Sequence, residues 1–476
     1  MFRIELPPGT HYASMWDIPD EYAGMTASML QRSRALVLHG EVDVTILTFQ
    51  HRKSFDPVRD RLRASGAMID RMRLINVWED VSAWTDDQLG AAMTTFNRPV
   101  PEGWEPLKAR EADEGRHVRE LRAESGRHIQ IDHFRPDGTL LASDRRHGEG
   151  MRDRSVILCD TRGNPLGAWR RASSFFALWL DTLRRDPVAW IIVDSKTSAN
   201  SLINYSRPDV VKIHVVRGSH LQRGGEAGTL VRSRRKVMKH LNSWDTVVFL
   251  TTTQRDEVAA LLGSQDNLKV IPNSRNVPRE APSLSRPSGR GVMLSSLVDR
   301  KRVQHAIRAM AEARGRRLRW KGRLEVWGSG PLKRKLSLLI VKLRAPVRLR
   351  GYSPNAVDEF AHASFSLLTS SAEGLPGVLI ESMGRGCIPI SYDMPYGPAD
   401  IITHGVNGFL VPNGDVKTLA AQIKFVVESS PADLAPLREA AYKRALEFSD
   451  ERVMGLWASL MAEIAARRDT SNAVDR

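Results

Sequence analysis

The chain has 476 residues, of which 42% are hydrophobic and 26% charged, so its length and balance predict a globular protein of two or three domains. Its two cysteines lie far apart, which excludes a disulfide-based scaffold. Neither a signal peptide nor a run of about 20 apolar residues is recognisable, so we expect a cytoplasmic protein. The net charge of +15, with a pI of about 10.0, predicts partners that carry negative charge.

The first part of the chain has the alternation of helix and strand signals that is typical of an α/β lobe. Gly24 precedes a segment with helical spacing of apolar residues, and an apolar, β-branched run at 40–50 follows it. Further strand-like runs lie at 190–196, 210–218, 245–252 and 267–274. We therefore predict an N-terminal Rossmann-like lobe made of residues 1–90 and 190–275.

The intervening residues, 91–189, have a different character. Two pairs of strand-like runs flank the turn residues Pro136-Asp137-Gly138 and Gly163-Asn164-Pro165. These hairpin signals predict an antiparallel β-meander domain that is inserted into the first lobe.

The second half of the chain returns to an α/β pattern. Residues 276–290 are rich in Pro, Ser and Arg and predict a linker. Strand and helix signals then alternate through residues 291–430, which predicts a second doubly wound domain, and residues 431–476 predict C-terminal helices. The predicted fold class is therefore α/β, with two doubly wound sheets and an antiparallel insertion.

The segment 365–391 contains two carboxylates at informative positions. Glu373 follows a predicted buried strand, and Glu381 lies about one turn into the helix that begins near Pro376. In an open α/β sheet, the loops beyond the carboxyl ends of the strands line the ligand crevice, and a helix start there favours an anion. A capped helix with two solvated glutamates is the alternative interpretation of this pattern.

The same segment carries a resemblance to a known family. The order Glu373-Gly374-Leu375-Pro376 and then Val378-Leu379-Ile380-Glu381 resembles the E-x7-E signature of family 4 glycosyltransferases. Residues 391–420 resemble the poly(glycerol-phosphate) α-glucosyltransferase group, and the resemblance extends over nearly the whole chain. It implies a retaining glycosyltransferase with the GT-B fold, in which two Rossmann-like domains face a cleft. It also implies a UDP-sugar as donor substrate, an N-terminal lobe for the acceptor, a C-terminal lobe for the nucleotide sugar, and no metal ion or other cofactor.

The resemblance implies roles for single residues. Lys301 matches the lysine that neutralises the donor diphosphate, Glu373 the glutamate that faces the donor sugar, and Glu381 the glutamate that binds the ribose. Gly24 matches a loop glycine that lets the backbone approach the phosphates. The remaining donor-binding positions implied by the match are Ser296, Arg300, Tyr352, Gly374, Leu375, Gly377 and Val378. For Lys301 the alternative is one more surface lysine in a basic run, and for Tyr352 it is ordinary packing.

Two positions near the expected phosphate site depart from the family pattern. Ser296 stands where an arginine is usual, five residues before the lysine, and Ala23 stands where the first of two loop glycines is usual. Arg300 or Arg302 would have to supply the missing positive charge.

The expected histidine against the donor sugar is also ambiguous. Arg217 occupies one usual histidine position, and His220 occupies the next. We therefore take His220 as the candidate catalytic histidine and interpret His214, on a predicted strand, as a core residue.

The positive charge is concentrated between Arg286 and Arg350, a stretch with 19 Lys and Arg and three acidic residues. Within it, residues 331–344 have the spacing of a basic amphipathic helix, whose apolar face comprises Leu332, Leu336, Leu339, Ile340 and Leu343. Such a helix fits peripheral contact with an anionic membrane, here the inner face of the plasma membrane. The alternative is a helix that covers its own sheet.

The leading hypothesis is an enzyme that moves glucose or N-acetylglucosamine from a UDP-sugar to a hydroxyl of a polyol-phosphate, teichoic-acid-like or lipid-linked polymer. In the group it resembles, the meander mediates trimer formation in some members, so we expect a homo-oligomer, a trimer or a dimer. The alternative hypothesis, motivated by Ser296 and Arg217, is a non-catalytic GT-B homologue that binds an anionic glycopolymer or a partner glycosyltransferase.

Two further classes of ligand are not expected. No pair of cysteines or histidines has metal-ligand spacing, so we expect no metal site. Only the high pI would suggest nucleic acid as a ligand. We do not expect it, because no recognisable nucleic-acid-binding module accompanies the high pI.

Overall fold

The computed structural model describes residues 2–20, 22, 24–52, 54–108, 118–146, 154–184, 186–222, 228–286, 289–317 and 319–474. It divides into two compact units. One comprises Pro7–Val215 and Ser233–Val247, and the other comprises Met1–Leu6, Val216–Arg232 and Val248–Arg476.

The predicted N-terminal strands form a sheet with the order β12-β11-β10-β9-β1-β2-β3 in the described part of the chain. Their bounds are β1 (Thr10–Ser14), β2 (Val44–Thr48), β3 (Met72–Asn76), β9 (Ala189–Val193), β10 (Val210–Val216), β11 (Thr246–Phe249) and β12 (Leu268–Val270). The pairs β10/β9, β9/β1, β1/β2 and β2/β3 are parallel. Every residue of β9 and β10 is buried, as expected for strands whose two faces are both covered.

The helices of the first unit connect these strands as crossovers. They are α1 (Met25–Gly40), α2 (Asp56–Ala64), α3 (Val77–Val81), α4 (Asp86–Met93), α5 (Ala172–Leu183), α6 (Lys196–Leu202) and α7 (Arg235–Met238), and a 3₁₀ turn, η2 (Leu241–Ser243), follows α7. Gly24 is the N-cap of α1 with a φ of 57°, a left-handed conformation that glycine adopts without strain.

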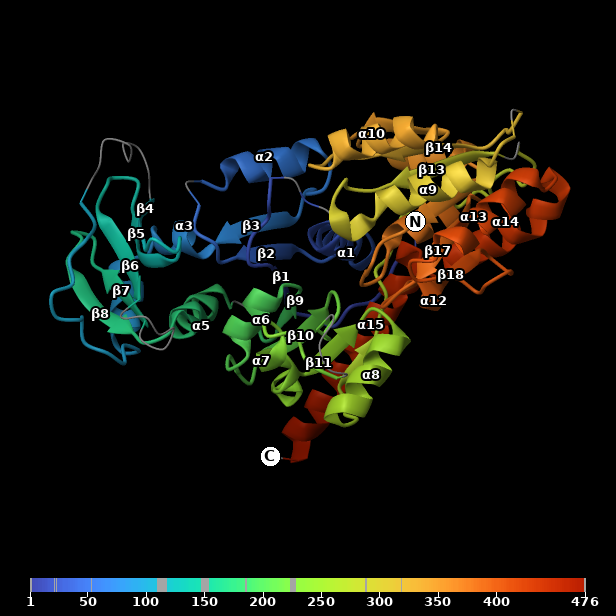
Figure 1. The fold of residues 1–476 in the computed structure, drawn as a ribbon. Helices are drawn as coiled ribbons and strands as arrows, with labels where there is room; N and C mark the ends of the chain where they lie inside the picture. Colours follow the sequence, from blue (N-terminus) through green and yellow to red (C-terminus); the bar gives the residue numbers. More distant parts are fainter. Residues whose placement is uncertain are drawn as a thin grey trace. The chain divides into compact units, whose positions relative to one another are not determined.

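The insertion is the predicted antiparallel meander, with strand order β4-β5-β6-β7-β8 over the described residues (Figure 1). Its strands are β4 (Val118–Arg122), β5 (His128–Phe134), β6 (Leu140–Arg146), β7 (Arg154–Cys159) and β8 (Pro165–Trp169). Both predicted hairpin turns are confirmed, because Gly138 and Gly163 each have a φ of 87° between paired strands.

The second unit is built on a parallel sheet with the order β15-β14-β13-β16-β17-β18 in the residues described. Its strands are β13 (Arg290–Leu294), β14 (Arg323–Trp327), β15 (Val347–Gly351), β16 (Phe365–Leu368), β17 (Ile388–Asp393) and β18 (Phe409–Pro412). Chain order runs outward from β13 to β15 on one side and from β16 to β18 on the other. The strand order therefore reverses between β13 and β16, and the carboxyl ends of strands at such a reversal are where doubly wound sheets bind their ligands.

The helices of this unit fall into two groups. Their bounds are α8 (Thr252–Leu262), α9 (Val303–Arg314), α10 (Lys333–Leu343), α11 (Gly377–Met383), α12 (Pro398–Ile401), α13 (Val416–Glu428), α14 (Pro431–Leu446) and α15 (Asp450–Val474), with the 3₁₀ turns η3 (Asp299–Lys301) and η4 (Ala356–His362). The helix α9 packs against α10 and α13, whereas α11 packs against α14 and η4. The predicted doubly wound architecture is thus confirmed, while the predicted domain limits stay a prediction.

The basic helix α10 corrects one detail of the expected membrane contact. Of the apolar face predicted to lie on lipid, Leu336 is buried and the other members are partly buried. The helix packs with that face toward α9 and β15. Its exposed apolar residues are instead Leu338 (73% exposed) and Val341 (75% exposed). None of the described helices combines the length and apolarity needed to cross a membrane.

Candidate functional site

The carboxyl ends of β13 and β16 bring two predicted site segments together. The chain after β13 leads through Ser296 to the short turn η3, which ends at Lys301, and the chain after β16 forms the loop that carries Glu373. Because neighbouring parallel strands end at the same edge of the sheet, residues 72 positions apart in sequence come into contact there.

The central contact is an ion pair between Lys301 and Glu373. The Lys301 Nζ donates a hydrogen bond to Glu373 Oε1 at 2.5 Å, and the two side chains are only 18% and 14% exposed. Arg300 Nη1 lies 3.4 Å from the second oxygen, Oε2, and its own side chain is half exposed. The site therefore holds one carboxylate against two cations, which leaves an excess of positive charge.

Backbone hydrogen bonds fix the loop that carries Lys301. The Thr369 hydroxyl donates to the carbonyl oxygens of Lys301 and Arg302, at 2.9 and 3.0 Å. The Ser371 amide donates to the Arg300 carbonyl, and the Arg300 guanidinium donates to the Ala372 carbonyl. Arg300 thus faces the Glu373 loop, whereas Arg302 donates to Asn413 Oδ1 on the other side. Of the two arginines considered for the charge missing at Ser296, Arg300 is the one beside Glu373.

The environment sets the charge state of Glu373. Burial raises the pKa of its carboxyl, but the positive charge and hydrogen bond of Lys301, a hydrogen bond from Ser370 and the charge of Arg300 together lower the pKa more. The net result is a pKa below the ordinary value of 4.5, so Glu373 is ionised at neutral pH.

Glu381 has a partner that sequence reasoning missed. Arg275 Nε lies 2.9 Å from Glu381 Oε1, and both side chains are mostly buried. The Arg275 guanidinium passes over Gly377 so closely that a Cβ there would lie 2.1 Å from it. The glycine at the start of α11 was the only sequence signal for a close neighbour. It did not identify Arg275, because Arg275 lies about a hundred residues earlier in the chain.

Backbone contacts also shape the loop between Glu373 and α11. Gly374 approaches the chain after β10, since a Cβ on it would lie 3.3 Å from the Gly218 amide nitrogen. The Tyr396 amide donates to the Glu373 carbonyl at 3.1 Å. Leu375 and Gly377 are buried, and Val378 packs partly buried against the core of the unit.

His220 lies in the same unit as Glu373 and is fully buried. Its ring stacks on Tyr396 with a centroid separation of 5.9 Å, and its Nδ1 is 3.4 Å from the Tyr396 hydroxyl, which donates to Glu257. Tyr396 thus connects the Glu373 backbone with the histidine. Sequence reasoning did not single out Tyr396, whose part depends on a fold-wide contact.

Two other polar residues near β10, Arg217 and His214, have different surroundings. Arg217 Nη1 donates to Asn273 Oδ1 at 2.5 Å. His214 is buried on β10, with its Nδ1 2.9 Å from the Val193 carbonyl and its ring beside Trp244. The interpretation of His214 as a core residue is therefore confirmed.

Several predicted site residues are not brought to this cluster. Tyr352 is 76% exposed, which rules out ordinary packing as the reason for an aromatic residue there, and Ser296 is exposed as well. Gly24 belongs to the other compact unit, and Ala23 lies outside the described residues. Their predicted contacts with a donor stay predictions.

The sequence of the second unit is similar to a known family. Residues 287–447 match the profile of the family described as Glycosyl transferases group 1.

Three known proteins are similar to larger parts of the chain. An exopolysaccharide phosphotransferase of Streptomyces coelicolor is 34% identical over 233 residues, which cover 47% of this chain and 24% of the relative. A poly(glycerol-phosphate) alpha-glucosyltransferase of Bacillus subtilis is 24% identical over 61% of this chain and 44% of the relative. A poly(ribitol-phosphate) alpha-N-acetylglucosaminyltransferase of Staphylococcus aureus is 21% identical over 92% of this chain and 96% of the relative. The chain thus spans less than half the length of the first two relatives.

The fold is similar to that of solved glycosyltransferases. A mutant of S. aureus TarM, solved in complex with fondaparinux, alpha-GlcNAc-glycerol and UDP, superposes with a TM-score of 0.70 at 18% identity, over 95% of this chain and 100% of that chain. The pneumococcal O-GlcNAc transferase GtfA gives a TM-score of 0.67 at 16% identity, over 96% and 99% of the two chains. These likenesses confirm the GT-B fold that the resemblance implied.

The lowered pKa of Glu373 predicts how stability depends on pH. We expect Glu373→Gln to lower the free energy of unfolding at neutral pH by about 1–3 kcal/mol, because it removes a hydrogen bond between charged groups. A carboxyl whose pKa is lowered by folding contributes stability that is present above its unfolded pKa and lost as the pH falls through the folded one. The difference between the two proteins should therefore stay constant down to about pH 4.5 and shrink below it.

Urea unfolding of both proteins at a series of pH values measures this difference. The exposed Glu312 provides the matched control, since Glu312→Gln should change stability little at any pH. A difference that grows toward acid pH would contradict the assigned direction of the pKa shift.

Proposed function

We propose that the chain is a retaining glycosyltransferase that moves a hexose, glucose or N-acetylglucosamine, from a UDP-sugar to a hydroxyl of a polyol-phosphate polymer. The observation that carries the proposal is the Lys301–Glu373 pair, held at the crevice of a domain that matches glycosyl transferases group 1. Two of the similar proteins are named as transferases that act on poly(glycerol-phosphate) and poly(ribitol-phosphate).

In this proposal the positive charge of the site binds the donor diphosphate. The bond between the sugar C1 and the diphosphate oxygen breaks while C1 bonds to the acceptor oxygen, and the diphosphate keeps the electron pair. Lys301 and Arg300 stabilise the charge that develops on this leaving group. We favour a front-face reaction, in which the diphosphate also takes the acceptor proton, so that no metal ion is needed at this site.

The carboxylates serve orientation rather than nucleophilic attack. Glu373, ionised and held by Lys301, accepts hydrogen bonds from donor sugar hydroxyls, and Glu381, held by Arg275, accepts them from the ribose. His220 contributes a buried polar edge beside the Glu373 loop, supported by Tyr396. Each side chain is already tethered by a neighbour, which reduces the entropy lost when the donor binds.

A non-catalytic homologue that binds an anionic glycopolymer or a partner glycosyltransferase is the second candidate. The substitutions at Ser296 and Arg217 favour it, because both remove a side chain that the family places near the donor. Arg300 beside Glu373 argues against it, since this arginine restores a second positive charge.

A panel of nucleotide sugars distinguishes the two candidates. We expect release of UDP from UDP-glucose or UDP-N-acetylglucosamine, accelerated by a polyol-phosphate acceptor. Glu373→Gln and Lys301→Ala should each lower kcat by about 10²–10³, the loss typical for removal of one charge-stabilising group. The measurement is the rate of UDP release with each donor.

Lys417→Ala and Glu312→Gln are the matched controls, because both side chains are exposed on other helices of the same unit. They should retain the full rate. No UDP release from any donor, together with no UDP binding by calorimetry, would favour the non-catalytic candidate.

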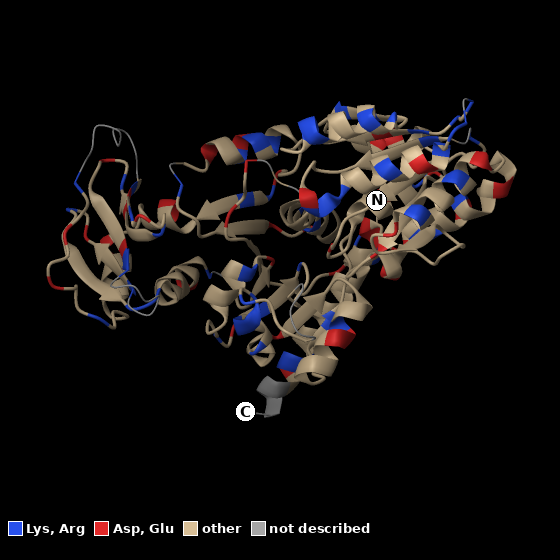
Figure 2. Ribbon diagram, viewed as in Figure 1, with Lys and Arg blue, Asp and Glu red and all other residues tan. Residues whose placement is uncertain are grey.

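We also propose that α10 contacts an anionic membrane, where a lipid-linked acceptor would lie. Leu338 and Val341 are three residues apart and exposed on one face of the helix. Exposed cations surround them, namely Lys333, Arg334, Lys335, Lys342 and Arg344, and Figure 2 shows this concentration of positive charge along α10. Apolar side chains within a basic surface fit the interface of an anionic bilayer, where each cation contributes about 1 kcal/mol.

Sedimentation with vesicles tests this contact. The wild-type protein should bind vesicles that contain phosphatidylglycerol, in a salt-dependent manner, and should not bind neutral vesicles. The double change Leu338→Gln with Val341→Gln should weaken binding about tenfold, because it removes apolar area from the interface. The matched double change Leu261→Gln with Leu456→Gln, at exposed leucines of α8 and α15, should leave it unchanged. Equal binding by both double variants would exclude α10 as the contact.

A further inference from the structure

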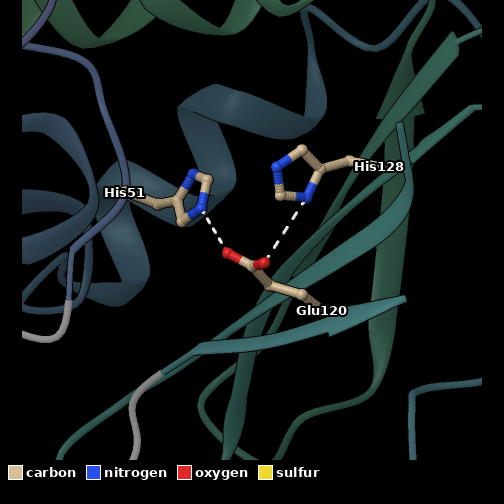
Figure 3. A group of neighbouring side chains, drawn as sticks. All are labelled: His51, Glu120 and His128. Carbon is tan, nitrogen blue, oxygen red and sulfur yellow. Dashed lines mark hydrogen bonds and ion pairs between the residues drawn. The ribbon is translucent and has the colours of Figure 1, made fainter. Parts of the chain in front are cut away.

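Three side chains with metal-binding atoms converge in the first unit, and none of them belongs to the proposed donor site. His51 follows β2, Glu120 lies on β4 and His128 begins β5, and their imidazole and carboxylate groups point toward one another (Figure 3). We propose that His51, Glu120 and His128 form a binding site for one divalent transition-metal ion, with Zn²⁺ as the best fit.

The distances between the donor atoms support this assignment. His51 Nε2 lies 2.7 Å from Glu120 Oε1, and His128 Nδ1 lies 3.6 Å from Glu120 Oε2. One donor atom from each residue lies within 4.8 Å of the others. In a tetrahedral zinc site with bonds of about 2.0–2.1 Å, neighbouring ligand atoms are about 3.3 Å apart. Small rotations of the side chains therefore suffice to enclose an ion.

A β-bulge gives His128 its direction. The pairing of β4 with β5 keeps one register from Val118↔His133 to Leu121↔Gln130 and then shifts so that Arg122 pairs with His128. Without this shift the strand alternation would turn His128 to the opposite face from Glu120. Bulges are frequent where a sheet redirects a side chain into a functional site. The shift is thus a second observation, independent of the distances, that favours a ligand.

The nitrogen of His128 that faces Glu120 lacks a hydrogen bond. His128 Nδ1 is buried and makes no hydrogen bond with any residue that the structure describes, although it lies within ion-pair distance of the carboxylate. A buried nitrogen without a partner is unfavourable, and such groups in native proteins call for an explanation. Coordination of an ion by Nδ1 provides one.

The surroundings restrict how the ligands move. The His51 ring makes edge-on contacts with His128 and His133, and His133 stacks on Trp78 with a centroid separation of 3.5 Å. Arg122 holds Glu120 Oε2 at 2.7 Å and is half exposed. It can keep that oxygen while Oε1 binds the ion, in the manner of an outer partner that orients a ligating carboxylate.

Three protein ligands leave a fourth coordination position for water. Because His51 lies after β2 whereas Glu120 and His128 lie on the inserted sheet, the ion would link these two parts of the unit and stabilise the fold. Short ligand spacing in sequence does not reveal this site, since His51 and Glu120 are 69 residues apart. The proposal does not depend on the proposed glycosyl transfer.

Metal titration of tag-free, chelator-treated full-length protein tests the site. We expect calorimetry and elemental analysis to find one Zn²⁺ per chain, and Co²⁺ to give the visible absorption bands of a tetrahedral complex. His51→Ala, Glu120→Gln and His128→Ala should each weaken Zn²⁺ binding at least tenfold. The matched controls are Glu124→Gln, in the β4–β5 turn, and His362→Ala, at an exposed histidine of the other unit, and both should bind as the wild type does.

Thermal unfolding gives a second readout. Zn²⁺ should raise the Tm of the wild type and leave that of Glu120→Gln unchanged. The Co²⁺ spectrum is measured on the wild-type protein. The proposal therefore stays testable even if one of the variants does not fold. Absence of a stoichiometric ion in the wild type, an octahedral Co²⁺ spectrum, or equal binding by all the variants would each overturn the proposal, the last because it would indicate adventitious surface binding.

Discussion

The ion pair between Lys301 and Glu373 is the constraint around which the proposed donor site is arranged. Neither charge is well solvated, so each depends on the other, and the pair joins the two loops at which the strand order reverses. The hydrogen bonds of Thr369 and Ser371 to the Lys301 loop serve the same end, because they fix the backbone from which the lysine extends. Strand order, loop geometry and charge therefore all favour this position for the proposed donor site.

This pair also limits what the site can bind. In the proposed function, a lysine already neutralised by a carboxylate offers an incoming diphosphate only part of its charge, and Ser296 stands where the family that the chain resembles usually has an arginine. Arg300 changes that balance, since it lies beside Glu373 while half of its surface remains in solvent. The cluster thus keeps a net positive charge without a buried, unpaired cation, whose desolvation would be costly.

Sequence patterns predicted those features that depend on neighbouring residues. The two doubly wound sheets follow from buried strand runs that alternate with helical spacing, and the meander follows from the turn residues at Gly138 and Gly163. Glu373 and Glu381 were found because a strand, a loop and a helix start lie together in one segment. Arg275 beside Glu381, and Tyr396 over His220, were missed because each contact joins distant parts of the chain. The helix α10 fits the alternative that it covers its own sheet, a choice that the sequence left open because amphipathic spacing identifies an apolar face but not whether protein or lipid covers it.

The cluster of His51, Glu120 and His128 shows why long-range geometry escapes sequence patterns even when every residue type is informative. Histidine and glutamate are common, and only a one-residue shift in strand pairing turns His128 to the face of Glu120. That shift leaves no local signature beyond an ordinary hairpin. The inserted sheet is also the part of the first unit that parallel strand pairing does not hold in place, so contacts such as the His133–Trp78 stack must position it. An ion at this junction would link the loop after β2 directly to the inserted sheet, so its binding free energy would add to the stability of the fold.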